Sequence, residues 1–291
     1  MRRRSVLAAT AGVAVVAGVA DLGLGEALTR PALHAVGAPP ADLGAEALAL
    51  QTAADAPVAG WLVSGVPGQG VVLLLHGVRS DRRQMVRRAR FLRRLGFGSL
   101  LIDLPGHGES PAAHITFGAN ESHAVTAALG YLARRFPGDR IGAIGVSLGA
   151  ASLVLAKPDP APAAVVLESM YPTIREATAD RLALHLGAFA RPLAPALLAP
   201  MRWRLGISPE ELRPIAALGG LHAPLLIAGG SRDEHTPEAE TRRLFAAAGE
   251  PKELWIVEGA AHVDLHAFDP AAYEARIGAF LAQALRAPVL A

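Results

Sequence analysis

The chain of 291 residues contains no cysteine, and this absence excludes several kinds of chemistry at once. Without thiols the protein can form no disulfide, bind no metal through thiolates and use no cysteine nucleophile. The absence leaves the redox compartment open, because an exported protein does not need disulfides.

Lysine is almost as scarce, since it occurs only at Lys157 and Lys252, and arginine supplies the rest of the positive charge. The formal net charge is only +2, and acidic residues are interspersed along most of the chain. Proteins that bind nucleic acid concentrate positive charge on one surface, so we expect no nucleic-acid partner. Hydrophobic residues make up 52% of the chain and charged residues 19%, which favours a folded protein with a large core.

The N-terminus is the one strongly biased segment. Arginines at positions 2–4 precede an uninterrupted run of small apolar residues over 6–20. This pattern is typical of an export or membrane-insertion signal, and the arginine pair before Ser-Val-Leu also resembles a twin-arginine signal. The run is shorter than the roughly 20 residues that span a bilayer. We therefore predict a cleaved signal peptide or a membrane anchor over 1–30, a linker over 31–44, and a domain over 45–291 on the extracytoplasmic side.

Strand-like and helix-like segments alternate within the predicted domain. Continuous apolar runs such as "VVLLLH" are typical of strands that are covered on both faces. The predicted strands are 46–52, 58–63, 71–76, 98–103, 140–146, 163–169, 224–230 and 253–259. The predicted helices are 81–96, 120–136, 148–156, 237–249 and 269–285. Strands joined by helices of this length predict an α/β fold with a mostly parallel eight-stranded sheet, helices on both faces and an antiparallel opening pair.

The stretch "GAIGVSLGA" places Ser147 between two glycines, where a predicted strand passes into a helix. In that context the pattern G-x-S-x-G is typical of a sharp turn that presents a nucleophilic serine. The backbone N–H of Leu148, at the positive end of the helix, would then face a developing oxyanion. The same pattern also arises by chance in a chain with 30 glycines, so Ser147 needs catalytic partners elsewhere.

Two suitable partners follow Ser147 in the chain. Asp233 and His262 each come directly after one of the last two predicted strands, at the sheet edge where α/β folds build their sites. A histidine can take the proton of a serine hydroxyl, and an acid can orient that histidine. Glu168 is an alternative acid. Asp233 is favoured because it lies in a Gly-Ser-x-Asp turn and because of its distance from His262 in the chain.

Five motifs together resemble the serine α/β-hydrolases, in the branch of monoacylglycerol lipases and serine aminopeptidases. They are "LLLHGVRSD", "DLPGHGES", "GVSLG", "GSRDEHTP" and "GAAHVDL", and they extend over about residues 70–265. The resemblance implies the α/β-hydrolase fold with a triad of Ser147, Asp233 and His262. It also implies a second oxyanion donor at the backbone N–H of Val78, water as the second substrate, and no cofactor.

The segment 171–218 interrupts the alternation with apolar helical stretches that prolines break. In the family that this chain resembles, an insertion at this place forms a cap over the nucleophile. A cap this apolar favours an acyl or alkyl pocket over a sugar or phosphate site. The arginine-rich helix over 81–96 is interpreted as a solvated face, with contact to anionic lipid as the less favoured alternative.

These patterns predict a serine hydrolase that cleaves a carboxylic ester of an acyl or lipid-like substrate. Thioester and amide hydrolysis remain alternatives, as does a non-catalytic module that binds a lipid. His262, Asp264 and His266 have a spacing that could suggest a metal site, but H-x-D-x-H alone is a poor metal signature, so no metal is expected. His76 and His107 are expected to tie loops together by hydrogen bonds.

Overall fold

In a computed structural model of the chain, residues 23, 25–52 and 57–286 are described. The strands of the main sheet are β2 (Glu46–Gln51), β3 (Pro57–Val63), β4 (Val71–Leu75), β5 (Gly98–Ile102), β7 (Ile141–Val146), β8 (Ala164–Glu168), β9 (Leu225–Gly230) and β10 (Lys252–Val257). They form an 8-stranded sheet in the order β10-β9-β8-β7-β4-β5-β3-β2. All strands of this sheet run in the same direction except β3, which is antiparallel to both of its neighbours, β2 and β5. The predicted mostly parallel sheet with an antiparallel opening pair is therefore confirmed.

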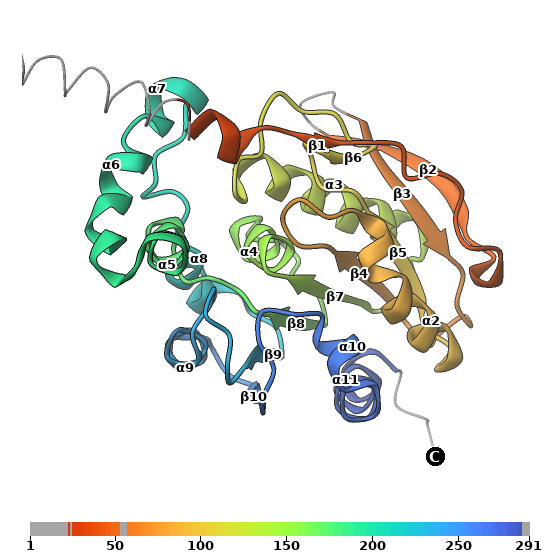
Figure 1. Cartoon of the computed structure of the whole chain (residues 1–291). Helices are drawn as coiled ribbons and strands as arrows, with labels where there is room; N and C mark the ends of the chain where they lie inside the picture. The colour runs from red at the N-terminus through yellow and green to blue at the C-terminus, as the bar shows by residue number, and fades with distance from the viewer. Residues whose placement is uncertain (1–22, 24, 53–56, 287–291) are drawn as a thin grey trace, which may run out of the picture.

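Helices cover both faces of the sheet (Figure 1). The main ones are α2 (Val86–Arg94), α3 (Ala119–Arg135), α4 (Leu148–Leu155), α9 (Glu238–Ala247) and α11 (Pro270–Leu285). Helices α2 and α11 share one apolar cluster with the sheet, and α3, α4 and α9 share the other. Because side chains alternate along a strand, β4 contributes Val72 and Leu74 to the first cluster and Leu73 and Leu75 to the second.

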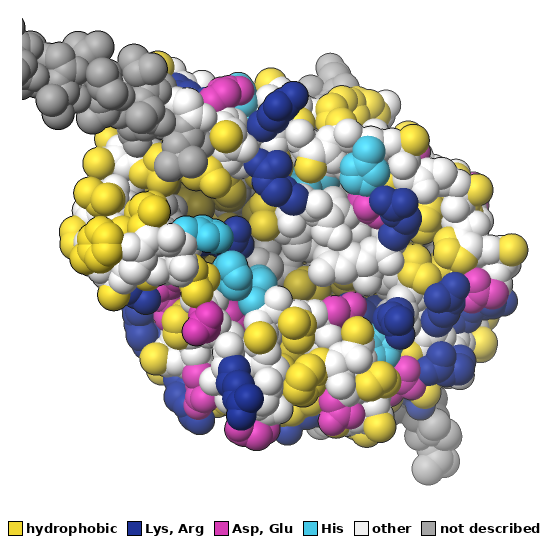
Figure 2. Space-filling model, viewed as in Figure 1, with side chains coloured by type: hydrophobic (Ala, Val, Ile, Leu, Met, Phe, Trp, Pro, Cys, Tyr) yellow, Lys and Arg dark blue, Asp and Glu magenta, His cyan; other side chains and the backbone are white. Residues whose placement is uncertain are grey.

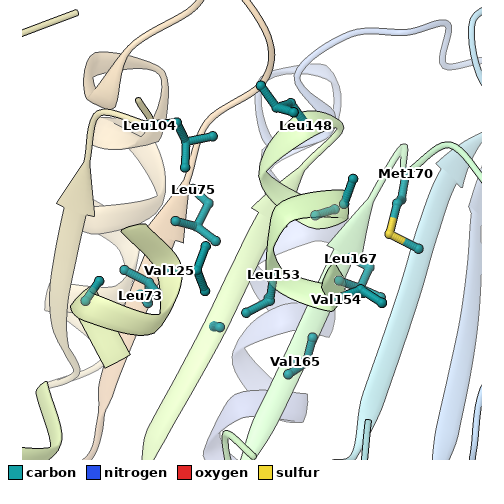
Figure 3. Close-up of a cluster of buried hydrophobic side chains, with 14 of the residues drawn as sticks. Leu73, Leu75, Leu104, Val125, Leu148, Leu153, Val154, Val165, Leu167 and Met170 are labelled. Carbon is teal, nitrogen blue, oxygen red and sulfur yellow. The ribbon is translucent and has the colours of Figure 1, made fainter. Parts of the chain in front are cut away.

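The second cluster fixes the helix that follows Ser147. Figure 3 shows part of it, with Leu73 from β4, Val125 from α3, Leu153 from α4 and Val165 from β8. All four side chains are fully buried. Interior packing of this density leaves little freedom for a helix to shift, so α4 holds its first turn in a fixed position.

The predicted helix over 81–96 begins as a 3-10 turn, η2 (Arg82–Met85), and continues as α2. Asp81 caps the turn, because its carboxylate accepts a hydrogen bond from Arg83 N. The interpretation of this arginine-rich segment as a solvated face is wrong at two positions. Arg82 and Arg88 are buried, and both are paired with buried carboxylates, as buried charges must be.

The segment between β8 and β9 is helical. It contains α5 (Ile174–Leu186), η3 (Ala188–Leu193), α6 (Ala194–Leu198), α7 (Met201–Leu205), α8 (Pro214–Ala217) and η4 (Leu218–Gly220). Thr173 caps α5 by accepting a hydrogen bond from Glu176 N. Helices α5, α6 and α7 stand beside the sheet domain, to the left of α4 in the view of Figure 1. We call α5 to α7 the cap.

Two buried carboxyl groups tie the cap to the domain. Asp180 of α5 pairs with Arg191 at 2.6 Å and shares a hydrogen bond with Glu240 of α9. Burial and the neighbouring Asp180 carboxylate raise the pKa of Glu240 to about 8. Glu240 is therefore protonated at neutral pH, and the pair is held by that proton rather than driven apart by like charges.

The segment 31–44, predicted as a linker, is instead packed onto the domain. Within it β1 (Ala32–Leu33) pairs in parallel with β6 (His107–Gly108), and Val36 and Leu43 are buried in the core. The carboxylate of Glu109 accepts hydrogen bonds from the backbone of Val36 and Gly37. The apolar residues of this segment are too few and too widely spaced for sequence periodicity to reveal their burial.

The predicted signal or anchor falls mostly on residues 1–22, which lie outside the described residues. Residues 25–30, which we also assigned to it, belong to the domain: Thr29 is buried, and its carbonyl accepts a hydrogen bond from Ile115 N at 2.7 Å. Among the residues that the structure describes, no helix is long and apolar enough to cross a membrane.

Candidate active site

Ser147 lies on a strained turn between β7 and α4. Its backbone angles are φ 49° and ψ −107°, a conformation that costs a non-glycine residue free energy and that recurs at functional sites. A Cβ on Gly145 would lie 2.6 Å from the Cα of Ala150, and one on Gly149 would lie 2.5 Å from the carbonyl oxygen of Leu75. The two glycines are therefore required by the turn that lifts the serine out of the sheet.

Two backbone N–H groups beside Ser147 are free to donate. Leu148 N at the start of α4 and Val78 N in the loop after β4 donate to no acceptor among the described residues. The loop is held by Gln84, whose side-chain oxygen accepts a hydrogen bond from Gly77 N at 2.8 Å. Free N–H groups that converge next to a nucleophile can stabilise an oxyanion.

Asp233 and His262 form a closed pair. His262 Nδ1 lies 2.8 Å from Asp233 Oδ2, although the two residues are on different loops. Asp233 also accepts hydrogen bonds from His235 N, Thr236 N and the Thr236 hydroxyl. These bonds fix the carboxylate, and the carboxylate fixes the plane of the His262 ring.

Burial disfavours the charge on Asp233, but the hydrogen bonds and charge of its partners outweigh that cost. The largest favourable contribution comes from His262, followed by Thr236, and the pKa of Asp233 is lowered. Asp233 is therefore ionised at neutral pH and can stabilise positive charge on the His262 ring.

The hydroxyl of Ser147 donates to no acceptor in the described part of the chain, and His262 Nε2 also has no partner there. Catalytic hydrogen bonds are often long or poorly aligned before substrate binds. The structure thus brings Asp233 and His262 together and leaves the Ser147 hydroxyl unengaged.

A cavity of about 390 Å³ opens at Ser147, within the usual size range of small-molecule sites. Ser147, Leu148 and Val78 line it together with residues of α5. Figure 2 shows the hollow between the cap and the sheet domain, with hydrophobic walls and histidine and arginine side chains at its edge. Leu28 also contributes to the wall, so the segment before β1 helps to shape the cavity.

The sequence profile of the alpha/beta hydrolase family matches residues 72–276. The chain belongs to the alpha/beta hydrolase family. The matched range contains Val78, Ser147, Leu148, Asp233 and His262. The predicted family and fold are therefore confirmed, whereas the narrower branch of monoacylglycerol lipases and serine aminopeptidases stays a prediction.

This hydrolase is similar to proteins from several organisms. The uncharacterized protein Rv2307c of Mycobacterium tuberculosis is 31% identical over 214 residues, which cover 72% of this chain and 69% of that protein. YqkD of Bacillus subtilis, also uncharacterized, is 22% identical over 228 residues, covering 77% and 75%.

Solved esterases share its fold. The esterase Pf2001 of Pyrococcus furiosus superposes with a TM-score of 0.72 at 22% identity, over 89% of this chain and 98% of that one. A thermophilic esterase of Thermogutta terrifontis gives 0.58 at 18% identity, over 82% and 99%. At these identities the likeness establishes the fold alone.

Glu168, the alternative acid, is engaged elsewhere in the fold. Its carboxylate accepts hydrogen bonds from Arg88 at 2.5 Å and 3.2 Å and from the Tyr273 hydroxyl at 2.5 Å. Arg88 also pairs with Asp264 at 2.9 Å, two residues after His262. Glu168 thus belongs to a buried ionic cluster behind the histidine loop and makes no contact with the His262 ring.

The possible metal triplet does not converge. His262 pairs with Asp233, Asp264 caps the short helix α10 (Leu265–Phe268) and pairs with Arg88, and His266 bonds Glu274 at 3.0 Å. Within the described ranges, no group of three His, Asp or Glu side chains is arranged to hold a metal ion.

Of the two signature-loop histidines, His76 ties two loops together as expected, whereas the hydrogen bond of His107 stays within its own loop. His76 Nδ1 bonds the Gly77 carbonyl at 2.7 Å, and His76 Nε2 accepts a hydrogen bond from Leu104 N at 3.0 Å. His107 Nδ1 bonds the Pro105 carbonyl at 3.0 Å. Burial lowers the pKa of both rings to about 4, so both are neutral and available for these bonds at neutral pH.

Sequence reasoning missed three residues near the site. Gln84 braces the loop of Val78, the His235 ring lies 4.9 Å from the His262 ring, and Arg181 of the cap lines the cavity. Only His235 carried a signal, because it stands within the motif "GSRDEHTP". Gln84 and Arg181 reach the site through the tertiary fold.

Proposed function

We propose that this protein is a serine esterase that cleaves a carboxylic ester with an apolar acyl or alkyl part through an acyl-enzyme on Ser147. One observation carries the proposal: an unengaged serine hydroxyl lies on a strained turn, beside two free N–H groups, in the lining of an apolar cavity. The closed pair of Asp233 and His262 supplies the base and its orienting acid.

In the proposed reaction His262 accepts the proton of Ser147 as the hydroxyl oxygen attacks the ester carbonyl. The N–H groups of Leu148 and Val78 stabilise the oxyanion, and ionised Asp233 stabilises the imidazolium. The imidazolium then protonates the departing alcohol. Water, activated by His262, attacks the acyl-enzyme, releases the acid and restores Ser147. The reaction needs no cofactor.

Esters are preferred here over amides and thioesters because the resemblance to monoacylglycerol lipases and the hydrophobic cavity wall both favour an acyl substrate. The amide alternative comes from the serine aminopeptidases of the same branch. A non-catalytic lipid-binding module is disfavoured, since such a protein has no need for a hydrogen-bonded Asp–His pair or a strained serine.

A series of para-nitrophenyl esters of increasing acyl length tests the proposal. We expect kcat/KM to rise from acetate to a medium-length acyl group and then to fall, because the cavity has a limited volume and an apolar lining. Matching para-nitroanilides should react at least tenfold more slowly. Faster hydrolysis of the anilides than of the esters would reassign the protein to the amide-cleaving alternative.

We also propose that the N-terminal segment exports the domain or anchors it in a membrane. The described chain begins beside the cap, where Arg204 of α7 pairs with Glu26. On the cap surface Phe189 and Trp203 are 82% and 68% exposed, which suits a surface that lies against lipid.

Cell fractionation with mass spectrometry of the mature N-terminus tests this. A mature N-terminus near Asp21 indicates that the signal is cleaved and the domain released. An intact N-terminus in the membrane fraction indicates an anchor. Intact protein found only in the cytosol refutes both export and anchoring.

A further inference from the structure

One face of α5 forms the cap side of the cavity. Its lining residues recur at the spacing of a helical face: Ala177, Thr178, Arg181, Leu182, His185 and Leu186. Most of these side chains are apolar or small, but an arginine stands in the middle of the face. Arg181 is exposed to solvent, so its charge is available to a ligand that enters the cavity.

Arg181 has no ion-pair partner and no hydrogen bond in the part of the chain that the structure describes. Arg175, on the same helix but outside the cavity, pairs with Glu210. The charge of Asp233 favours the charged form of Arg181, but the Asp233 carboxylate makes its hydrogen bonds with His262, Thr236 and the His235 backbone. The guanidinium is solvent-accessible through the cavity, and the surrounding protein lowers its pKa by desolvation.

Arg79 brings a second positive charge to the same cavity. It follows Val78, has φ 58°, and donates to the backbone carbonyls of Ala27 and Leu28 rather than to a carboxylate. Its charge acts repulsively on Arg181. His185 stands on the same wall, and no Asp or Glu is among the described residues that line the cavity.

Two guanidinium groups line one cavity to whose lining no described Asp or Glu side chain contributes, so an anion that enters the cavity is attracted by both. Guanidinium groups bind carboxylate and phosphate through paired, charge-assisted hydrogen bonds. We propose that the substrate is an ester that carries a negatively charged carboxylate or phosphate group, and that Arg181 and Arg79 bind this group within the otherwise apolar cavity. This inference rests on the proposed esterase function and adds a charged group to the apolar substrate proposed there. The charged group and the apolar chain of the substrate would bind in the same cavity.

Matched substrates isolate the charge. The mono-para-nitrophenyl ester of adipic acid carries a free carboxylate, and its methyl-capped diester has the same chain without the charge. A second arm compares a monoacylglycerol with the glycerol-phosphate ester of the same acyl group. The first arm places the anion on the acyl side of the scissile bond and the second places it on the alcohol side, so the arms distinguish the two sources of the anion.

We expect wild-type protein to hydrolyse the charged member of at least one pair with a kcat/KM about tenfold higher, mainly through a lower KM. Arg181→Gln should bring this ratio close to one, and Arg181→Lys should retain part of it. Arg175→Gln, on the same helix but outside the cavity, should keep the wild-type ratio.

Equal or poorer turnover of the charged member in both arms would overturn the inference while leaving the esterase proposal intact. The same holds for an Arg181→Gln ratio that matches wild type. Loss of turnover for every ester, neutral ones included, would instead refute the esterase function and the inference that rests on it. Calorimetric titration of Ser147→Ala protein with the adipate monoester and with the glycerol-phosphate ester measures anion binding without turnover, and absent binding of both esters also counts against the site.

Discussion

Replacing Ser147 with alanine is expected to lower ester hydrolysis by about a thousandfold or more and to abolish covalent labelling by a fluorophosphonate probe. The substitution removes the oxygen that forms the acyl-enzyme in the proposed reaction. It removes no hydrogen bond of the described structure, because the Ser147 hydroxyl makes none there. The melting temperature should therefore stay close to that of the wild type, and the loss can be assigned to chemistry rather than to unfolding.

Ser122→Ala is a matched control, because Ser122 lies on α3 and bonds the Ala119 carbonyl within its own helix. This variant should be labelled at the wild-type rate. His262→Ala should slow labelling of Ser147 by a similar order as it slows hydrolysis, since the probe also needs an activated hydroxyl. Labelling of Ser147→Ala at the wild-type rate would show that the nucleophile is another residue.

The parts of the fold and site that could be predicted are those with local signals. Strands such as β4 are continuous apolar runs, and the turn at Ser147 requires glycine two residues before and after it, as the close approaches at Gly145 and Gly149 explain. Asp233 carries a local signal as well, because it accepts hydrogen bonds from the two residues that follow Glu234 in "GSRDEHTP". These interactions join residues that are close in sequence.

The features that could not be predicted depend on partners far apart in the sequence. Arg88 stands among exposed arginines, and nothing next to it distinguishes it from Arg87 or Arg90. Its burial is decided by Glu168, 80 residues later on β8, and by Tyr273, 185 residues later on α11. The packing of 31–44 and the position of Arg181 could not be predicted for the same reason. Periodicity shows which face of an element is apolar, but it does not show which residues of another element pack against that face.

The buried cluster of Arg88, Glu168, Tyr273 and Asp264 connects the sheet to the loop that carries His262. Burial opposes the charge of Arg88, but Glu168 and Asp264 outweigh this cost and raise the pKa of Arg88. Arg88 is fully buried and its partner Glu168 is 1% exposed, so removing either charge leaves the other with little water to solvate it. The cluster therefore holds the histidine loop as long as both charges are present.

Arg88→Met is accordingly expected to lower the free energy of unfolding by about 3–5 kcal/mol, the usual cost of leaving one buried charge unpaired. Glu168→Leu should destabilise in the same direction, because it removes the buried carboxylate that pairs with Arg88. The double variant Arg88→Met with Glu168→Leu should lose less stability than the sum of the corresponding single changes, because it leaves no unpaired charge at either of these two positions. Chemical denaturation of the four proteins of this cycle measures the coupling, and strictly additive losses would show that the pair does not act as a unit.

Asp233→Asn separates this structural role from catalysis. It is expected to reduce kcat/KM by about a thousandfold or more, since an amide neither carries the negative charge that stabilises the imidazolium nor favours the correct tautomer of His262. Glu168→Gln should keep substantially more activity than Asp233→Asn when both are assayed well below their melting temperatures, because Glu168 contacts Arg88 and Tyr273 rather than the His262 ring. If Glu168→Gln proved the more damaging of the two to turnover in folded protein, Glu168 and not Asp233 would be the acid of the triad.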